Sequence, residues 1–115
     1  MSKLIVAFDV DDTLIIPPIA TGLDRDVPNY DTIAVYRWFQ AQGYTMLIWS
    51  GGGKEYAQSW GEKLGLNANF YDDKHDCLLV PDLTFDDSDL TLGTVNVKVK
   101  RINNGIVRYS ETLKK

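Results

Sequence analysis

Continuous apolar runs of strand length dominate the hydrophobic pattern of the chain. Residues 4–8 read Leu-Ile-Val-Ala-Phe, and residues 44–49 form a second run, Tyr-Thr-Met-Leu-Ile-Trp. A continuous run, unlike an alternating one, is typical of a strand buried on both faces of a parallel sheet. Shorter apolar segments around Phe70 and at residues 83–85 predict two further strands. The pattern therefore predicts an α/β fold with a mostly parallel central sheet.

Two helices are predicted between these strands. Apolar residues recur at helical spacing over residues 33–41, and Asn29 or Asp31 can cap this helix. Residues 54–64 form the second helical stretch, which a glycine follows. We expect Trp38, on the first helix, to pack in the core.

Residues 14–29 interrupt this regular pattern directly after the first strand. They include three prolines and one glycine, which exclude a regular helix or a central strand. We therefore expect a flap loop that lies over the end of the first strand. Arg25 is the cation in this loop that could reach an anionic ligand at that strand end, and it could equally pair with Asp24 or Asp26.

The C-terminal part of the chain shows an alternating pattern instead. Val95, Val97 and Val99 alternate with polar residues, as in a half-exposed strand. The Asn-Asn-Gly sequence at 103–105 is a strong hairpin turn signal. We expect a β-hairpin over residues 94–110.

Length and composition are those of one globular domain that spans residues 1–115. The chain is 44% hydrophobic and 24% charged, and its single cysteine excludes an intrachain disulfide, so we expect a reducing, cytoplasmic location. No apolar run approaches the ~20 residues of a membrane span. The acids that follow residue 8 also argue against a signal peptide.

Charge is distributed unevenly along the chain, whose net charge is −4. Residues 1–93 hold six basic and fifteen acidic residues, whereas residues 94–115 hold six basic and one acidic. The acidic body argues against broad nucleic-acid binding. The basic tail could contact a phosphorylated substrate or a neighbouring subunit, or it could be a solvated strand face.

Carboxylates gather directly after two of the predicted strands. Asp9, Asp11 and Asp12 follow the first strand. Asp86 and Asp87 follow the fourth. Ligands of open α/β sheets bind outside the carboxyl ends of the strands, and all-oxygen ligand sets suit Mg²⁺. A solvated acidic turn is the simpler alternative for each cluster taken alone, but two clusters at two strand ends favour a cation site.

The second strand ends in a glycine-rich turn before a helix. Ser50, Gly51, Gly52 and Gly53 precede the helical stretch that begins at Lys54. Glycines let backbone N–H groups approach an anion, and the helix N-terminus adds its positive end. The spacing is not that of a Walker A loop. We expect a phosphate-binding turn, with an ordinary strand-to-helix turn as the alternative.

These motifs together resemble those of the haloacid dehalogenase superfamily of phosphohydrolases. Residues 9–13, Asp-Val-Asp-Asp-Thr after an apolar strand, resemble its first motif, DxDxT. Ser50 at a strand end resembles the second motif, and the pair Asp86 and Asp87 resembles the fourth. The resemblance covers residues 4–89 and implies a reduced Rossmann-like three-layer fold that lacks a cap domain.

The superfamily's third motif is a lysine that holds the phosphate and screens the nucleophile. Lys74 matches it by order and position, and Lys54 at the glycine-rich turn is the alternative. Residues 72–82 leave little space for the helix that carries this lysine in the superfamily. His75 beside it could act as an acid or base, or it could be a solvated surface residue.

The function that the resemblance implies is Mg²⁺-dependent hydrolysis of a phosphate monoester through an aspartyl-phosphate. Asp9 would be the nucleophile, Asp11 the general acid and base, and Lys74 the cation that reduces charge repulsion. The substrate phosphate would be bound by Ser50, Gly51 and Gly52, and Mg²⁺ by Asp9, the backbone carbonyl of Asp11, Asp86 and Asp87.

Two other functions remain open at this point. The same residues could transfer the phosphoryl group to an acceptor other than water, or the domain could bind Mg²⁺ and phosphate without turnover. A receiver-type signalling domain ranks lower, because we expect a single acid on its central strand. Without a cap domain the site would admit a bulky phosphorylated substrate or be closed by a second subunit in a homo-oligomer.

Overall fold

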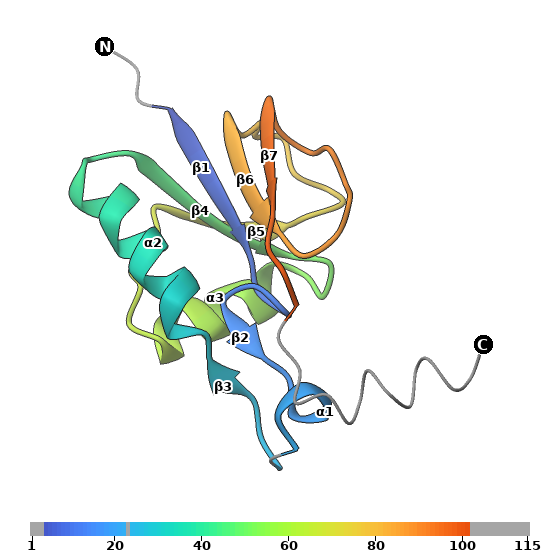
Figure 1. Ribbon diagram of the computed structural model, residues 1–115. Coiled ribbons are helices and arrows are strands. Elements are labelled where there is room, and N and C mark those ends of the chain that lie inside the picture. The colour runs from blue at the N-terminus through green and yellow to red at the C-terminus, as the bar shows by residue number, and fades with distance from the viewer. Residues whose placement is uncertain (1–3, 23, 102–115) are drawn as a thin grey trace.

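A five-stranded parallel sheet lies at the centre of the molecule (Figure 1). The structure is a computed structural model that describes residues 4–22 and 24–101. The sheet order is β5-β4-β1-β6-β7, and each neighbouring pair is parallel. The expected α/β fold with a parallel sheet is confirmed. The strands are Ile5–Asp9 (β1), Thr45–Ser50 (β4), Phe70–Asp73 (β5), Leu83–Asp86 (β6) and Val95–Lys98 (β7).

Both predicted helices form close to their predicted bounds. Tyr30–Ala41 (α2) joins β1 to β4, and Lys54–Lys63 (α3) joins β4 to β5. The Asn29 side chain caps α2 by accepting a hydrogen bond from the Thr32 N–H at 3.4 Å. No helix of the described residues is long and apolar enough to cross a membrane.

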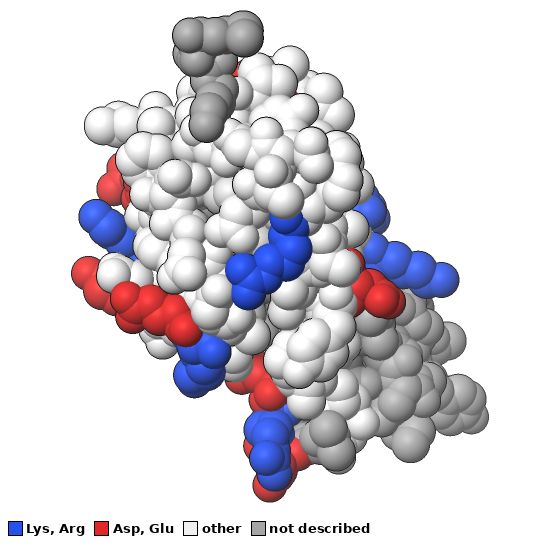
Figure 2. All heavy atoms as spheres, turned by 90° about the vertical axis from the view of Figure 1, so that its left-hand side faces the viewer, with Lys and Arg blue, Asp and Glu red and all other residues white. Residues whose placement is uncertain are grey.

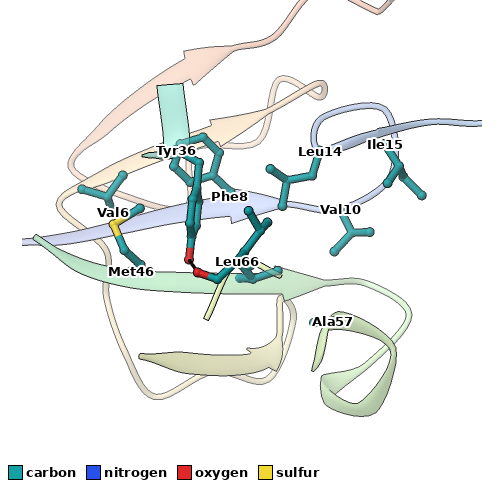
Figure 3. Close-up of a cluster of buried hydrophobic side chains, with 10 residues drawn as sticks. Val6, Phe8, Val10, Leu14, Ile15, Tyr36, Met46, Ala57 and Leu66 are labelled. Atoms are coloured by element: carbon teal, nitrogen blue, oxygen red, sulfur yellow. Dashed lines mark hydrogen bonds between the residues drawn. The ribbon is translucent and has the colours of Figure 1, made fainter. Parts of the chain in front are cut away.

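Phe8 of β1 lies in the main core, which packs between the sheet and the two helices (Figure 3). Its ring stacks on Phe85 of β6 at 4.5 Å and meets the edge of Tyr36 of α2 at 5.2 Å. The Tyr36 hydroxyl donates a hydrogen bond to the Leu66 carbonyl at 3.2 Å, so this buried polar group is satisfied. The buried members of the cluster are Val6, Phe8, Val10, Leu14, Ile15, Tyr36, Met46, Ile48, Ala57 and Leu66.

The opposite face of the sheet is covered by loops. Ala7, Leu47 and Trp49 are buried there, and Cys77 and Leu79, from the β5–β6 connection, pack against them. α2 and α3 both lie on the Phe8 face, so no helix of the described residues contributes to this second cluster. Helices therefore cover only one face of the sheet, and among the described residues loops stand in place of the second helical layer that the predicted three-layer fold would have.

The strand order reverses at β1. The chain moves outward from β1 to β4 and β5 through helices on one face, and then returns to β6 by a loop on the other face. Connections that run in opposite directions along the sheet have the same handedness when they lie on opposite faces, so both can be right-handed, as crossovers between parallel strands nearly always are. The reversal leaves a crevice between the carboxyl ends of β1 and β6, where open α/β sheets bind their ligands.

The segment over residues 14–29 is more regular than the sequence predicts. Ile15–Ile16 (β2) and Val27–Pro28 (β3) form a small antiparallel pair, and Pro18–Thr21 (α1) makes one helical turn between them. The described part of this segment has no regular helix and no central strand, as its prolines and glycine predict, but the single helical turn and the β2–β3 pair make it more ordered than a plain loop. Proline is compatible with these positions, because Pro18 lies in the first helical turn and Pro28 lies on a two-stranded edge.

β7 pairs in parallel with β6, so it is a fifth strand of the main sheet. The predicted hairpin turn at 103–105 and its return strand lie outside the described residues. Asn96 fixes β7 through its side chain, which accepts hydrogen bonds from the Thr84 hydroxyl at 2.7 Å and the Gly93 N–H at 2.9 Å. Its amide also donates to the Gly93 carbonyl at 2.8 Å.

The outer side of α2 faces solvent. This side of the molecule is mostly uncharged, with a basic side chain near its middle and both basic and acidic side chains at its margins (Figure 2). Trp38 is 56% exposed, so the expectation that it packs in the core is wrong. Its ring contacts Phe39 edge-on at 5.0 Å, and the inward position belongs to Tyr36.

We expect Gly93→Ala to destabilise the fold by loosening β7. A Cβ at this position would lie 2.9 Å from the Pro81 carbonyl oxygen and 2.7 Å from Thr84 Cγ2. Overpacking of this kind costs about 1–3 kcal/mol. Urea unfolding should show this loss, whereas the exposed neighbour substitution Thr94→Ala should change the free energy of unfolding by less than about 0.5 kcal/mol. Equal stability of the two variants would contradict the tight β6–β7 connection.

Candidate active site

Asp9 is the last residue of β1 and is only 4% exposed. Directly after it, the Val10 carbonyl accepts hydrogen bonds from the backbone N–H groups of residues 13, 14 and 15. Asp12 has a positive φ of 61° in this tight turn, a conformation that Asp tolerates better than most residues. The turn takes the chain out of the sheet, which leaves Asp11 exposed at the edge while Asp9 stays buried.

Two further acids lie at the end of β6. Asp86 is 3% exposed, and its Oδ1 accepts hydrogen bonds from both the N–H and the hydroxyl of Ser88, at 3.0 and 2.9 Å. The Arg101 Nε donates to Asp87 Oδ2 at 2.7 Å. One carboxylate oxygen from each of Asp9, Asp86 and Asp87 lies within 4.8 Å of the others. The structure thus brings together three of the four predicted metal ligands.

Lys74 lies between the buried acids. Its Nζ donates to Asp9 Oδ1 at 3.2 Å and to Asp86 Oδ2 at 3.0 Å, and the side chain is 10% exposed. Its backbone N–H donates to the Ser50 carbonyl at 2.9 Å, which holds the start of the β5–β6 loop over the end of β4. Lys54 is exposed at the start of α3 and does not line the same pocket. No helix is needed to deliver the lysine, because the loop itself crosses the carboxyl edge.

The acids of this cluster ionise differently. Burial, and then repulsion from Asp86, raises the pKa of Asp9 from 3.8 to about 7, although Lys74 acts against this shift. Burial also opposes ionisation of Asp86, but the hydrogen bonds from Ser88 and Lys74 outweigh it and lower the Asp86 pKa. Burial disfavours the ammonium of Lys74, yet the two acids raise its pKa above the ordinary value. Lys74 and Asp86 therefore form a charged pair, and ionisation of Asp9 beside them, as a second buried carboxylate, is unfavourable.

The glycine-rich turn lies beside the acids. Ser50 is buried, and its hydroxyl accepts a hydrogen bond from the Gly52 N–H at 3.0 Å. Gly53 adopts a φ of 107° just before α3, a conformation that favours glycine. A Cβ at Gly51 would lie 3.2 Å from the Nε2 of His75, so this exposed histidine lies close to the turn.

One pocket of about 350 Å³ connects these groups. All predicted site residues except Asp86 line it, and Asp86 joins the site through its contact with Lys74. Arg25 does not line it and instead pairs with Asp24 at 3.2 Å, as the alternative interpretation expects. The lining residues are Asp9, Asp11, Asp12, Ser50, Gly51, Gly52, Lys74, Asp87, Ser88 and Arg101.

Three residues of this site were not predicted from the sequence. Ser88 and Arg101 line the pocket, and the Tyr56 hydroxyl donates to Asp11 Oδ1 at 2.7 Å. Ser88 lies within the second acidic cluster, so its place in the sequence could have indicated that it belongs to the site. Arg101 could not be identified, because the sequence does not show that β7 pairs in parallel with β6 and ends at the same edge.

The donor set fits a hard divalent cation. Three carboxylates from two neighbouring strand ends offer oxygen atoms within 4.8 Å of one another, and burial followed by repulsion from Asp86 raises the pKa of Asp9, so a bound cation would favour its ionised form. Oxygen ligands of this kind suit Mg²⁺ or Ca²⁺ and not the softer metals. The cluster is therefore a candidate cation site within the candidate active site.

Comparisons of the chain with protein-family models, with curated proteins and with solved structures found no match. The resemblance to the haloacid dehalogenase superfamily therefore stays a prediction from the motifs, and the chemistry has to be argued from the site itself.

We expect Asp9→Asn to change how stability depends on pH in metal-free buffer. Because folding raises the pKa of Asp9 from 3.8 to about 7, the folded state holds this proton more tightly, and the contribution of Asp9 to wild-type stability falls as pH rises between these values. The variant cannot lose this proton. Its free energy of unfolding should thus rise relative to wild type between ~pH 4 and ~pH 7, measured by urea unfolding with a chelator.

The control is Asp31→Asn, which removes an exposed carboxylate on α2 and should follow wild type over the same range. A constant difference between Asp9→Asn and wild type at all pH values would contradict the raised pKa.

Proposed function

We propose that this protein is a Mg²⁺-dependent phosphatase that hydrolyses a phosphate monoester through an aspartyl-phosphate on Asp9. The observation that carries the proposal is the position of Lys74, whose ammonium contacts Asp9 and Asp86 in a pocket that also includes the Ser50–Gly52 turn. A buried carboxylate can act as the nucleophile in phosphoryl transfer, and a fixed cation and a glycine-rich turn can stabilise the charge of the transferred group. The motif resemblance supports the same assignment.

Asp9 is the group best suited to attack phosphorus. It is buried at the end of β1 and lines the pocket, whereas Asp86 does not line it and has Ser88 and Lys74 as partners. In the first step an Asp9 oxygen bonds to phosphorus while the bond from phosphorus to the leaving oxygen breaks. Asp11, exposed at the pocket edge, donates a proton to that oxygen.

The second step releases phosphate. Asp11 takes a proton from a water molecule, the water oxygen bonds to phosphorus, and the bond between phosphorus and Asp9 breaks. The two steps in sequence return the enzyme to its starting state, with Asp9 as a carboxylate and Asp11 protonated for the next turnover. Proton exchange with solvent is open to Asp11 because its side chain is exposed.

An anionic nucleophile and an anionic phosphate repel each other, so the site needs positive charge. Lys74 supplies a fixed charge within hydrogen-bond distance of Asp9, and the N–H groups of the Ser50–Gly52 turn add partial positive charge. Mg²⁺ held by Asp9, the Asp11 backbone carbonyl, Asp86 and Asp87 would offset the remaining negative charge and favour the ionised form of Asp9.

A non-catalytic module that binds Mg²⁺ and phosphate is the second candidate function. Its main support in the sequence was the missing helix for the third-motif lysine. The contact of Lys74 with both acids weakens that support, because the loop delivers a lysine to the site without a helix. Transfer to an acceptor other than water would use the same residues in the first step and differ only in the second.

We expect Asp9→Asn to abolish phosphate release and to keep the fold. The amide cannot form the acyl phosphate, and the substitution preserves the shape of the side chain. Phosphate release from p-nitrophenyl phosphate and from a panel of phosphorylated metabolites, with and without Mg²⁺, is the measurement. Asp31→Asn, on the exposed side of α2, should retain wild-type activity.

Wild-type turnover by Asp9→Asn would exclude the aspartyl-phosphate route. Binding of Mg²⁺ and inorganic phosphate by a wild-type protein that releases no phosphate from any ester would favour the non-catalytic module.

Lys74→Gln should reduce kcat/KM by about 10²–10³-fold, the usual effect of removing one fixed electrostatic contact from a transition state. Lys54→Gln is the matched control and should leave kcat/KM within a factor of about two, because Lys54 is exposed and does not line the pocket. Circular dichroism of both variants checks the fold. The opposite ranking of the two variants would move the third-motif role to Lys54.

A further inference from the structure

The hydroxyl of Tyr56 donates a hydrogen bond of 2.7 Å to Asp11 Oδ1. Tyr56 is the third residue of α3, so it follows the glycine-rich turn closely in the chain, whereas Asp11 lies in the turn after β1. The two residues are 45 positions apart in the sequence. This contact therefore joins the turn that would bind phosphate to the acid that would exchange the proton.

The ring of Tyr56 is held in place by the glycine-rich turn. A Cβ at Gly52 would lie 3.2 Å from the ring Cδ2 and 3.3 Å from Cγ, so the ring packs closely against the backbone there. Burial, followed by the hydrogen bond to Asp11, raises the pKa of Tyr56 to about 12. The phenol is therefore a hydrogen-bond donor throughout the neutral range, and Asp11 Oδ1 is its acceptor.

We propose that Tyr56 is a positioning residue that fixes the carboxyl group of Asp11 for proton transfer to the leaving oxygen. The hydrogen bond occupies Oδ1 and assigns proton exchange to Oδ2. It also limits rotation of the side chain, which is exposed and would otherwise sample several orientations. This inference rests on the proposed function, since it assigns Tyr56 a part in the phosphatase reaction.

If Tyr56 positions the acid, its removal should affect alkyl phosphates and aryl phosphates differently. The leaving group of an alkyl phosphate, such as a sugar, nucleoside or glycerol phosphate, is a strongly basic alkoxide unless it receives a proton as the bond to phosphorus breaks. p-Nitrophenolate is a stable anion and needs no such proton. Loss of the positioned acid should thus slow the first step for alkyl phosphates far more than for p-nitrophenyl phosphate.

The test compares Tyr56→Phe with wild type on p-nitrophenyl phosphate and on the best alkyl phosphate from a panel. The parameter is kcat/KM, which reports the step up to formation of the phosphoenzyme and is insensitive to its hydrolysis. We expect kcat/KM to fall about 10-fold on the alkyl phosphate and less than about 2-fold on the aryl phosphate. The expected loss on the alkyl phosphate is smaller than the 10²–10⁴-fold that a positioned acid contributes, because Asp11 itself is still present. The inhibition constant of inorganic phosphate should stay unchanged, because Tyr56 does not line the pocket.

Tyr36→Phe is the matched control. It also removes a tyrosine hydroxyl from a hydrogen bond, but its partner is the Leu66 carbonyl in the core. Any effect of Tyr36→Phe should come through stability and should scale both substrates equally.

The outcomes separate the two proposals. If wild type hydrolyses both esters and Tyr56→Phe loses equally on both, or loses on neither, the phosphatase function stands and the positioning role is wrong. If wild type hydrolyses no ester, the proposed function is wrong and the role of Tyr56 in it falls as well. A selective loss on the alkyl phosphate, absent from Tyr36→Phe, supports the inference.

Discussion

The ammonium of Lys74 allows buried carboxylates to lie side by side at the carboxyl edge of the sheet. Asp9 and Asp86 are both almost fully buried, and each contacts this ammonium within 3.2 Å. Burial of like charges is unfavourable unless cations and hydrogen bonds compensate them. Here compensation is partial, because the pKa of Asp9 is still raised to about 7. Burial and repulsion from Asp86 both oppose ionisation of Asp9, which is the physical reason to expect a cation at the site.

The position of Lys74 in turn depends on how the chain crosses the sheet. A helix would normally carry the chain from one parallel strand to the next. Here the loop after β5 crosses the edge directly, anchored by the hydrogen bond from the Lys74 N–H to the Ser50 carbonyl. The same loop supplies Cys77 and Leu79 to the second core cluster. One short segment therefore closes a face of the sheet and delivers the cation of the site.

Much of the candidate site is predictable from local sequence. Asp9, Ser50 and Asp86 each end a strand, and a parallel sheet collects such ends at one edge whatever the detailed topology. The residues that were missed reach the site by other routes. Tyr56 comes from a helix and Arg101 from the segment that follows β7, and neither position carries a local pattern that indicates a role. Trp38 shows the same limit in the core, since helical spacing alone does not indicate which neighbouring aromatic residue points inward.

The sequence by itself determined the strands, the two main helices and the acidic strand ends, because these follow from apolar runs, capping residues and glycines within a few positions of one another. Only the tertiary structure brought Lys74, and not Lys54, to the buried acids, made β7 a fifth parallel strand, and put loops in place of a helical layer. Those outcomes depend on contacts between residues far apart in the chain, where packing and charge compensation, not local propensity, select the arrangement.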